Sequence, residues 1–361
     1  MKRVLILANN DMGLYRFRCE LIKKLQEDNE VHISVPEGEY SEELSALGCK
    51  LYFTDIDRHG TNPLKELLLI NYYKKLIKKV KPDVVFTYTI KPNIYGGLAC
   101  KMLKVPYAPN ITGLGTAIEN EGLFAKVLLT LYKIALKKAH TVFFQNSQNL
   151  KIFKDKKIIC GKYVLLPGSG VNLETNPFEE YPEENEKQIL LFVGRIMKDK
   201  GVEELVSSAR NLKAEYDNLT VRMVGPMESD YAQEFKKFKA EDYVELCGPQ
   251  KDVHAFMKEA NAVVVPSYHE GMSNVCLEAA ACGRPLLASD IPGCREAFDD
   301  GVSGFGFEPC SAEDLQKAVE RFINLSHSEK AQMGKAGREK MEKEFNRNII
   351  VNKYLEVIEN L

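Results

Sequence analysis

The feature that most constrains the fold of this sequence is the regular alternation of short, almost wholly apolar runs with longer segments of helical periodicity. Strands that are apolar on both faces and separated by helices indicate a parallel sheet covered on both sides. Because strand–helix–strand connections are right-handed, such a chain winds into a doubly wound α/β domain. The strands expected in the first half are 3–9, 30–35, 50–56, 83–89, 105–112 and 140–146.

Residues 167–187, rich in Pro, Gly, Asn and Glu, interrupt this alternation and are typical of a linker. The alternation then resumes, with strands expected at 188–194, 219–225, 243–248, 262–267 and 284–289. The sequence therefore predicts two doubly wound, Rossmann-like domains, 1–168 and 169–344, which face each other across a cleft lined by the carboxyl ends of both sheets. The remaining segment, 345–361, is predicted to be an amphipathic helix that packs back on the first domain.

Charge and cysteine usage exclude several classes of protein. The 361 residues include 49 Lys and Arg and 51 Asp and Glu, so the net charge of −2 argues against a nucleic-acid binder, whose domains are strongly basic. No apolar run reaches the roughly 18 residues of a membrane-spanning helix, and the start of the chain resembles a buried strand rather than a signal peptide. Nine scattered Cys without a CxxC pair favour reduced thiols in a cytoplasmic protein, and the six His show no metal-ligand spacing, so we expect no metal.

The strongest candidate for chemistry is the loop and helix between the runs AVVVPS (262–267) and RPLLAS (284–289). Gly271 allows close approach of a ligand to the backbone, and Ser273 or Asn274 can cap the helix. The amides of 271–274, which include that of Met272, then face the positive end of the helix dipole and suit a diphosphate.

Two carboxylates flank this group of amides. Glu270 stands before the helix, and Glu278 lies one turn inside it, with a side chain that can reach back to a ribose diol at the helix start. The alternative is that Glu278 makes a surface salt bridge and Glu270 only begins a turn.

A second candidate is the loop GRIMKDKG (194–201), which directly follows the strand expected at 188–194. Arg195 and Lys200 can neutralise the charge that grows on a departing diphosphate. The alternative is that both are solvated surface cations. Three glycines that end apolar strands, Gly194, Gly225 and Gly248, can let a nucleotide base lie against the backbone, although glycine after a strand is also ordinary turn chemistry.

Several loops of the first domain can contribute to an acceptor site, since each follows a predicted strand. Gly13 lies in the first of these loops, NNDMGLYRFR (9–18), where it is expected to precede a helix and approach a phosphate. The side chains or glycines expected at the acceptor are Arg16, Arg18, Arg58, Asn62, Lys91, Thr112 and Gly113. For Arg16 and Arg18, charges on a helix surface are the alternative.

The segment 121–138 joins a wide apolar face to Lys126, Lys133, Lys137 and Lys138. With the lysines of 74–81, it can rest on an anionic membrane surface. The alternative is a helix packed on the sheet with its lysines in water.

The motifs quoted above resemble those of the retaining glycosyltransferases of family 4, which have the GT-B fold. The resemblance lies in Glu270 and Glu278 with seven residues between them, in the segment AAACGRPLLASDIPGCREAF that follows, and in the Arg/Lys loop 194–201. The first half, through NNDMGLYRFR, the R-x3-NP of 58–63 and the GLG of 113–115, resembles bacterial enzymes that extend polyprenyl-diphosphate-linked glycans, including capsule and N-acetylgalactosaminyl transferases.

The resemblance implies a role for each donor-side residue. Arg195 and Lys200 would hold the donor diphosphate, Glu270 and the amides after it would meet the transferred sugar, and Glu278 would bind the ribose. Gly13 would lie near the diphosphate, and the turns at Gly225 and Gly248, with Val253 beyond them, would line the base.

The expected reaction is retaining transfer of a hexose or N-acetylhexosamine from a nucleotide-diphosphate sugar, UDP by resemblance, to a lipid-linked or polysaccharide acceptor in cell-surface glycan assembly. Neither a cofactor nor a metal is expected, because the two cations would take the place of the metal ion. The place of action is the cytoplasm or the cytoplasmic face of the membrane. Two alternatives stay open: a non-hydrolysing UDP-sugar epimerase, and a catalytically silent scaffold that binds nucleotide sugar.

Overall fold

A computed structural model describes residues 1–361 except 57–59, 61, 114–121, 160, 185–186 and 239–242. The chain divides into two units, which are described separately. Unit 1 comprises Met1–Ser169 and Arg347–Leu361, and unit 2 comprises Gly170–Asn346. The sequence analysis placed these boundaries at 168/169 and 344/345. The first strand ends at Leu7 rather than at residue 9, and Asn10 is the N-cap residue of the helix that follows.

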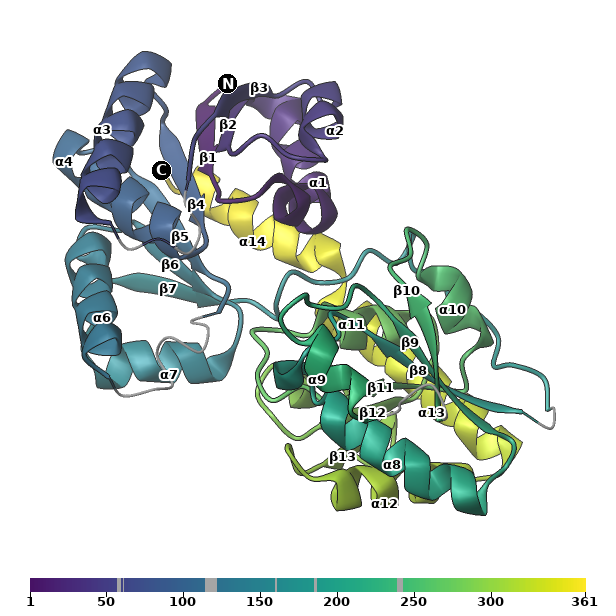
Figure 1. Cartoon of the computed structure of the whole chain (residues 1–361). Coiled ribbons are helices and arrows are strands. Elements are labelled where there is room, and N and C mark those ends of the chain that lie inside the picture. The colour runs from purple at the N-terminus through teal and green to yellow at the C-terminus, as the bar shows by residue number, and fades with distance from the viewer. Residues whose placement is uncertain (57–59, 61, 114–121, 160, 185–186, 239–242) are drawn as a thin grey trace. The chain divides into compact units, whose positions relative to one another are not determined.

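Unit 1 is built on a parallel sheet of seven strands in the order β3-β2-β1-β4-β5-β6-β7. The strands are β1 (Arg3–Leu7), β2 (Glu30–Val35), β3 (Lys50–Phe53), β4 (Val84–Tyr88), β5 (Tyr107–Ile111), β6 (Thr141–Phe144) and β7 (Lys162–Leu165). Its helices are α1 (Asp11–Asp28), α2 (Ser41–Ala46), α3 (Pro63–Val80), η1 (Pro92–Gly96), α4 (Gly97–Leu103), α6 (Leu123–Leu136), α7 (Ser147–Asp155) and α14 (Arg347–Glu359). Helix α4 packs between α3 and α6 beside the sheet (Figure 1).

Unit 2 is built on a parallel sheet of six strands in the order β10-β9-β8-β11-β12-β13. The strands are β8 (Gln188–Val193), β9 (Leu219–Val224), β10 (Val244–Gly248), β11 (Ala262–Val265), β12 (Leu286–Ser289) and β13 (Gly304–Phe307). The helical segments are η2 (Lys198–Lys200), α8 (Val202–Glu215), α9 (Ala232–Lys236), α10 (His254–Glu259), α11 (Asn274–Ala281), η4 (Arg295–Ala297), α12 (Ala312–Ile323), α13 (His327–Lys340) and η5 (Met341–Phe345).

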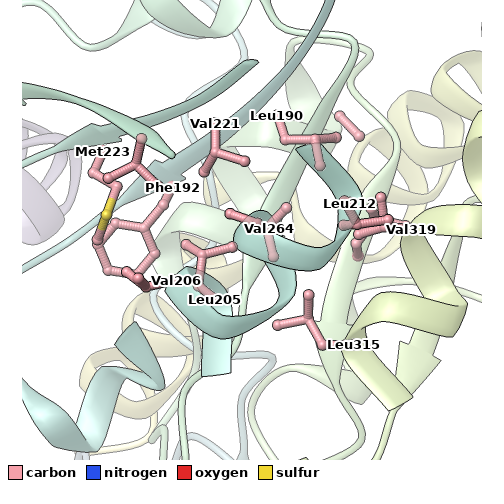
Figure 2. Packing of buried hydrophobic residues seen from close by; sticks show 14 of the residues in the cluster. Leu190, Phe192, Leu205, Val206, Leu212, Val221, Met223, Val264, Leu315 and Val319 are labelled. Carbon is pink, nitrogen blue, oxygen red and sulfur yellow. The ribbon is translucent and has the colours of Figure 1, made fainter. Parts of the chain in front are cut away.

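The core of unit 2 shows why the apolar runs become central strands. Leu190, Val221 and Val264 come from three neighbouring strands and are each at most 2% exposed. Figure 2 shows them packed against leucines and valines of α8 and α12, such as Leu205 and Val319. A strand with both faces covered by helices must be apolar throughout, which is the pattern of these runs.

The last helix, α14, completes the core of unit 1. Tyr354 is buried against the rings of Phe86 and Phe143, with ring centroids 5.5 and 4.4 Å away, and its hydroxyl donates to Asn110 Oδ1. At the start of the helix, Arg347 Nη1 pairs with Glu20 of α1 at 2.9 Å. The chain therefore crosses from unit 1 to unit 2 and back, and unit 1 is closed by its final helix.

Two strands of the structure were not expected from the sequence. The edge strands β7, KYVL, and β13, GFGF, do not form apolar runs, because β7 is mostly exposed and β13 alternates glycine with phenylalanine. In the described part of 167–187 there is no strand or helix, as expected of a linker. None of the described helices is both long and apolar enough to cross a membrane.

Candidate active site

The strand order in unit 2 changes direction at β8 and β11, two parallel strands that are neighbours at the centre of the sheet. The chain leaves β8 towards β9 on one side and leaves β11 towards β12 on the other. At such a switch point the loops after the two strands separate and leave a crevice outside the carboxyl ends, where doubly wound domains bind ligands. The loop after β8 is 194–201 and the loop after β11 is 266–273, the two segments singled out in the sequence.

A glycine holds these two loops against each other. Gly201 adopts φ +66°, and a Cβ atom placed on it would lie 1.9 Å from Pro266 O. Next to this contact, Tyr268 N donates to Asp199 O at 3.0 Å. Any side chain at position 201 would force the loops apart, so Gly201 is the residue that brings the Arg/Lys loop to the end of β11.

An ion pair joins the two loops at the crevice. Lys200 Nζ lies 2.5 Å from Glu270 Oε1, and the side chains are 23% and 16% exposed. The same carboxylate oxygen accepts a hydrogen bond from the buried Ser267 Oγ at 2.9 Å. Two donors on one oxygen orient the carboxylate, so Lys200 and Glu270 form an oriented ion pair at the switch point.

The start of α11 is shaped by a second glycine. Ser273, not Asn274, is the N-cap, and its side chain accepts from Cys276 N at 3.3 Å. Its own amide donates to Gly293 O at 2.7 Å, so this N–H is used inside the protein, contrary to the expectation that all four amides of 271–274 face a ligand. Gly293 has φ +89°, and a Cβ on it would lie 2.8 Å from Glu270 O.

The residues before and within α11 differ in exposure. Met272 is buried in an apolar cluster, so only its backbone is placed to meet a ligand. Cys276 and Leu277 are also buried, whereas Asn274 and Glu278 are partly exposed. Since they are four residues apart, Asn274 and Glu278 share one face of α11.

The three glycine turns are joined by backbone hydrogen bonds. Gly194 N donates to Val224 O and Gly225 N to Gly248 O, both at 2.9 Å. A Cβ on Gly225 would lie 1.9 Å from Gly194 O, so close packing of neighbouring strands already requires this glycine. Gly248 has open space around its Cβ position, and the partly buried Val253 precedes α10.

Arg195 is paired with a different carboxylate from that of Lys200. Its Nη1 atom is 2.9 Å from Glu228 Oε1, and its side chain is 59% exposed. Glu228 lies in the segment after β9, and its backbone N donates to Ile196 O at 3.2 Å, so the ion pair joins the loop after β8 to the segment after β9. The sequence treated Arg195 and Lys200 as one cationic pair, but the structure gives them different carboxylate partners.

In unit 1, Gly13 belongs to a helix rather than preceding one. Helix α1 begins at Asp11, and the capping side chain of Asn10 accepts from Gly13 N at 2.5 Å. A Cβ on Gly13 would lie 2.6 Å from Asn10 Oδ1, so a side chain at position 13 would displace the capping side chain of Asn10. The sequence analysis expected this helix to begin after Gly13, because the polar residues at 9–11 hide its first turn.

The two arginines of α1 differ in environment. Arg16 Nη2 donates to Tyr40 OH at 2.8 Å in an exposed contact. Arg18 is 4% exposed, and its guanidinium lies over the rings of Tyr88 and Tyr354 at 5.1 and 6.0 Å. The alternative of a helix-surface charge is wrong for Arg18, because the side chain is buried against Tyr88 of β4 and Tyr354 of α14. Its contact with an acceptor stays a prediction.

The other acceptor-side residues have local roles of their own. Asn62 caps α3 by accepting from Leu64 N at 3.0 Å. Lys91 Nζ pairs with Glu66 Oε1 at 2.5 Å. Thr112 and Gly113 follow β5 and are partly exposed. Arg58 lies outside the described residues.

Two models of glycosyltransferase families match the chain. The model described as glycosyl transferases group 1 matches residues 174–340, and the model described as glycosyl transferase 4-like matches residues 3–146. The chain belongs to the glycosyltransferases. The resemblance to glycosyltransferases and the enzyme class, a glycosyltransferase, are thus confirmed, whereas retention of configuration stays a prediction.

Curated relatives align with this glycosyltransferase over nearly its whole length. The N,N'-diacetylbacillosaminyl-diphospho-undecaprenol alpha-1,3-N-acetylgalactosaminyltransferase of Campylobacter jejuni is 29% identical, with 99% of each chain covered. The capsular polysaccharide biosynthesis glycosyltransferase CapM of Staphylococcus aureus is 26% identical, with 96% of this chain and 93% of CapM covered.

Solved structures confirm the predicted α/β fold of the GT-B type. HepE of Anabaena, in complex with UDP and glucose, superposes with a TM-score of 0.82 at 16% identity, and all of both chains is covered. A glycosyltransferase of Rickettsia africae gives a TM-score of 0.82 at 20% identity, with 99% of this chain and 97% of that chain covered.

The sequence analysis of this transferase missed four residues that shape the candidate site: Gly201, Ser267, Glu228 and Gly293. Ser267 ends an apolar run three residues before Glu270, which is the only signal it carries. Gly201 and Gly293 act through contacts with the backbone of another segment, which a linear motif cannot show.

The buried thiols of Cys276 and Cys294 belong to the apolar core of unit 2. A hydrogen bond with Cys276, together with burial, raises the pKa of Cys294 well above its usual value. Within the described ranges, no three His, Cys, Asp or Glu side chains are arranged to hold a metal ion.

Proposed function

We propose that this glycosyltransferase moves a hexose or N-acetylhexosamine from a UDP-sugar to a lipid-linked saccharide, with retention of the anomeric configuration, in cell-surface glycan assembly. The observation that carries the proposal is the pairing of Lys200 with Glu270 at the switch point of unit 2. A cation, a carboxylate and the start of α11 meet there, and these are the groups that a sugar diphosphate needs.

Each group has a separate task in the proposed reaction. Lys200 and Arg195 stabilise the negative charge that forms on the diphosphate as the glycosidic bond breaks. Glu270, held by Lys200 and Ser267 through one oxygen, keeps its other oxygen for a hydroxyl of the transferred sugar. Glu278, on the partly exposed face of α11, binds the ribose hydroxyls. The leaving phosphate takes the proton of the acceptor hydroxyl on the same face of the sugar, which retains the configuration.

The relatives support the donor and the acceptor. HepE was solved with UDP and glucose, and the name of the Campylobacter relative specifies a diphospho-undecaprenol acceptor. We propose the same two classes for this chain. The two cations supply the charge that a metal ion would otherwise provide, so the reaction is proposed to need no metal.

We also propose that unit 1 contacts the cytoplasmic face of the membrane, where a lipid-linked acceptor resides. The support comes from α6, on which an exposed apolar stripe runs beside a row of lysines, as in helices that lie on anionic bilayers. The exposed apolar residues of this stripe are Leu123, Phe124, Val127 and Ile134, and the lysines beside it are Lys126, Lys133 and Lys137.

The proposed function is tested by incubating the protein with radiolabelled UDP-hexoses and UDP-N-acetylhexosamines, with and without an undecaprenyl-diphosphate-linked saccharide. We expect label in the lipid fraction, an α-linkage by NMR and undiminished transfer with EDTA. An isomerised nucleotide sugar without acceptor would instead identify an epimerase. Binding of UDP-sugar without turnover, for every donor and acceptor tried, would identify a scaffold.

A further inference from the structure

A hollow of about 390 Å³ lies at the carboxyl edge of the sheet of unit 1, between the residues that follow β3 and the first turns of α3. Its polar wall consists of Asp55, Lys65, Glu66 and Lys91, and its apolar wall includes Leu68 and Tyr72. The size falls in the range of small-molecule sites, roughly 300–1,000 Å³. None of the roles argued above for unit 2 uses this hollow.

The charged part of the wall is fixed by contacts inside the protein. Lys91 Nζ lies 2.5 Å from Glu66 Oε1 and donates to Gly60 O at 2.7 Å, and the paired side chains are 14% and 11% exposed. Burial, reinforced by the Glu66 carboxylate, raises the pKa of Tyr95 to about 12. A pair held in this way keeps its geometry before a ligand arrives, so little ordering is needed on binding.

This mixture of groups matches a saccharide. Carboxylates and ammonium groups can bond to sugar hydroxyls, and the tyrosine ring and leucines can pack on the apolar face of a pyranose. A free diphosphate is a poorer match, because the carboxylates of Asp55 and Glu66 offset the charges of Lys65 and Lys91.

An apolar stripe leads away from the hollow along α3. Leu67 and Leu68 lie about one turn after Leu64 on the solvent side of the helix, and the three leucines are 57%, 69% and 71% exposed in that order. Leu68 belongs to both the stripe and the wall of the hollow. A sugar site that continues into exposed leucines has the polarity of a glycolipid.

We propose that this hollow binds the saccharide of the lipid-linked acceptor and that its lipid lies along Leu64, Leu67 and Leu68. The inference rests on the proposed function and assigns the acceptor to a site on unit 1. Asp55 is a specificity-determining residue of that site, because its carboxylate lines the hollow and can bond to sugar hydroxyls. Since Asp55 is exposed, it can be replaced without leaving a buried charge.

The chain has no tryptophan, so Leu67→Trp introduces a single indole reporter on the stripe. The probe is undecaprenyl-diphosphate-linked N-acetylglucosamine in detergent, and undecaprenyl phosphate is the sugar-free comparison. We expect both lipids to shift the indole emission to shorter wavelength. Adding Asp55→Asn should raise the half-saturating concentration of the glycolipid about tenfold, the usual effect of one charge-assisted hydrogen bond, and leave that of undecaprenyl phosphate unchanged.

Two variants serve as matched controls. Glu42→Gln changes an exposed carboxylate on α2 outside the hollow, and Val302→Trp places the indole at an exposed apolar position of unit 2. Equal half-saturation for Asp55→Asn and Glu42→Gln, or an equal emission shift for Leu67→Trp and Val302→Trp, would overturn the inference. Calorimetry with UDP tests the donor site of unit 2 separately. If the unmodified protein does not bind UDP, the donor site is refuted, and the glycolipid titrations still decide the acceptor site.

Discussion

At the scale of single residues, the candidate site depends on which carboxylate holds each cation. Lys200 is paired with Glu270 and Arg195 with Glu228. Ion pairs of this kind orient the side chains, and a bound diphosphate would compete with the carboxylates for the same cations. The two cations therefore make separable contributions to donor binding and to turnover.

Lys200→Ala should lower kcat by roughly 10²-fold or more, because it removes a donor that acts on the charge of the transition state. The neighbouring Lys198→Ala, an exposed lysine of the same loop, is the matched control and should retain nearly normal kcat. Steady-state transfer assays measure the effect, with circular dichroism to verify the fold. Near-normal turnover of Lys200→Ala would contradict the assigned role.

At the scale of the elements, glycines control how the loops after the strands meet. Gly201 and Gly301 both have positive φ, +66° and +75°, but only Gly201 has a backbone atom in the place of a Cβ. A comparison of the two positions therefore separates the conformational cost of a side chain from the cost of moving a loop.

Gly301→Ala should destabilise unit 2 by about 1 kcal/mol, the cost of positive φ alone. Gly201→Ala should cost at least about 2 kcal/mol more, because the new Cβ overlaps Pro266 O. The free energy of unfolding, obtained from urea titrations of both variants, measures the difference. Equal destabilisation would show that the loop moves without cost.

The linker residue Glu179 gives a pH dependence to the stability of unit 2. Hydrogen bonds from His254 and Lys258 hold the pKa of this carboxyl below its usual value of 4.5. A lowered folded-state pKa means that the stabilisation is complete above about pH 4.5 and is lost as the pH falls through the folded-state value. Glu179→Gln should therefore reduce the loss of unfolding free energy below pH 4.5, and the exposed Glu180→Gln should not. Urea titrations between pH 3 and pH 7 measure both slopes, and parallel curves for the two variants would contradict the prediction.

The sequence predicted the elements better than their ends and contacts. The central strands were recognisable because residues such as Leu190 and Val264 are buried on both faces, and burial on both faces imposes an apolar run. The short edge strands carry no such constraint. At the site, Lys200 and Glu270 were identifiable as charged residues after strands. Their pairing with each other, and that of Arg195 with Glu228, depends on the register of neighbouring loops, which no single segment encodes.

At the scale of the whole molecule, α14 is a late element of the chain that completes the core of unit 1. Tyr354, 1% exposed, packs against both Phe86 and Phe143, and in the sequence its helix is separated from the rest of unit 1 by all of unit 2. The stability of unit 1 is therefore sensitive to a side chain that lies far away in the sequence.

Tyr354→Ala should destabilise unit 1 by about 3–5 kcal/mol, as large-to-small changes of buried aromatic residues do. Tyr163→Ala, a change of an exposed tyrosine on the edge strand β7, should have little effect. Limited proteolysis followed by mass spectrometry would locate the loss, with new cleavage sites expected in 1–169 and not in 170–346. Cleavage spread evenly over both units would contradict the assignment.

The discontinuity of unit 1 also has a consequence for biosynthesis. Translation is vectorial, so residues 1–169 emerge from the ribosome long before 347–361. Until then the rings of Phe86 and Phe143 have no Tyr354 to cover them, whereas 170–346 already holds every strand of its own sheet. Nascent chains halted before residue 347 should consequently bind chaperones through their first half.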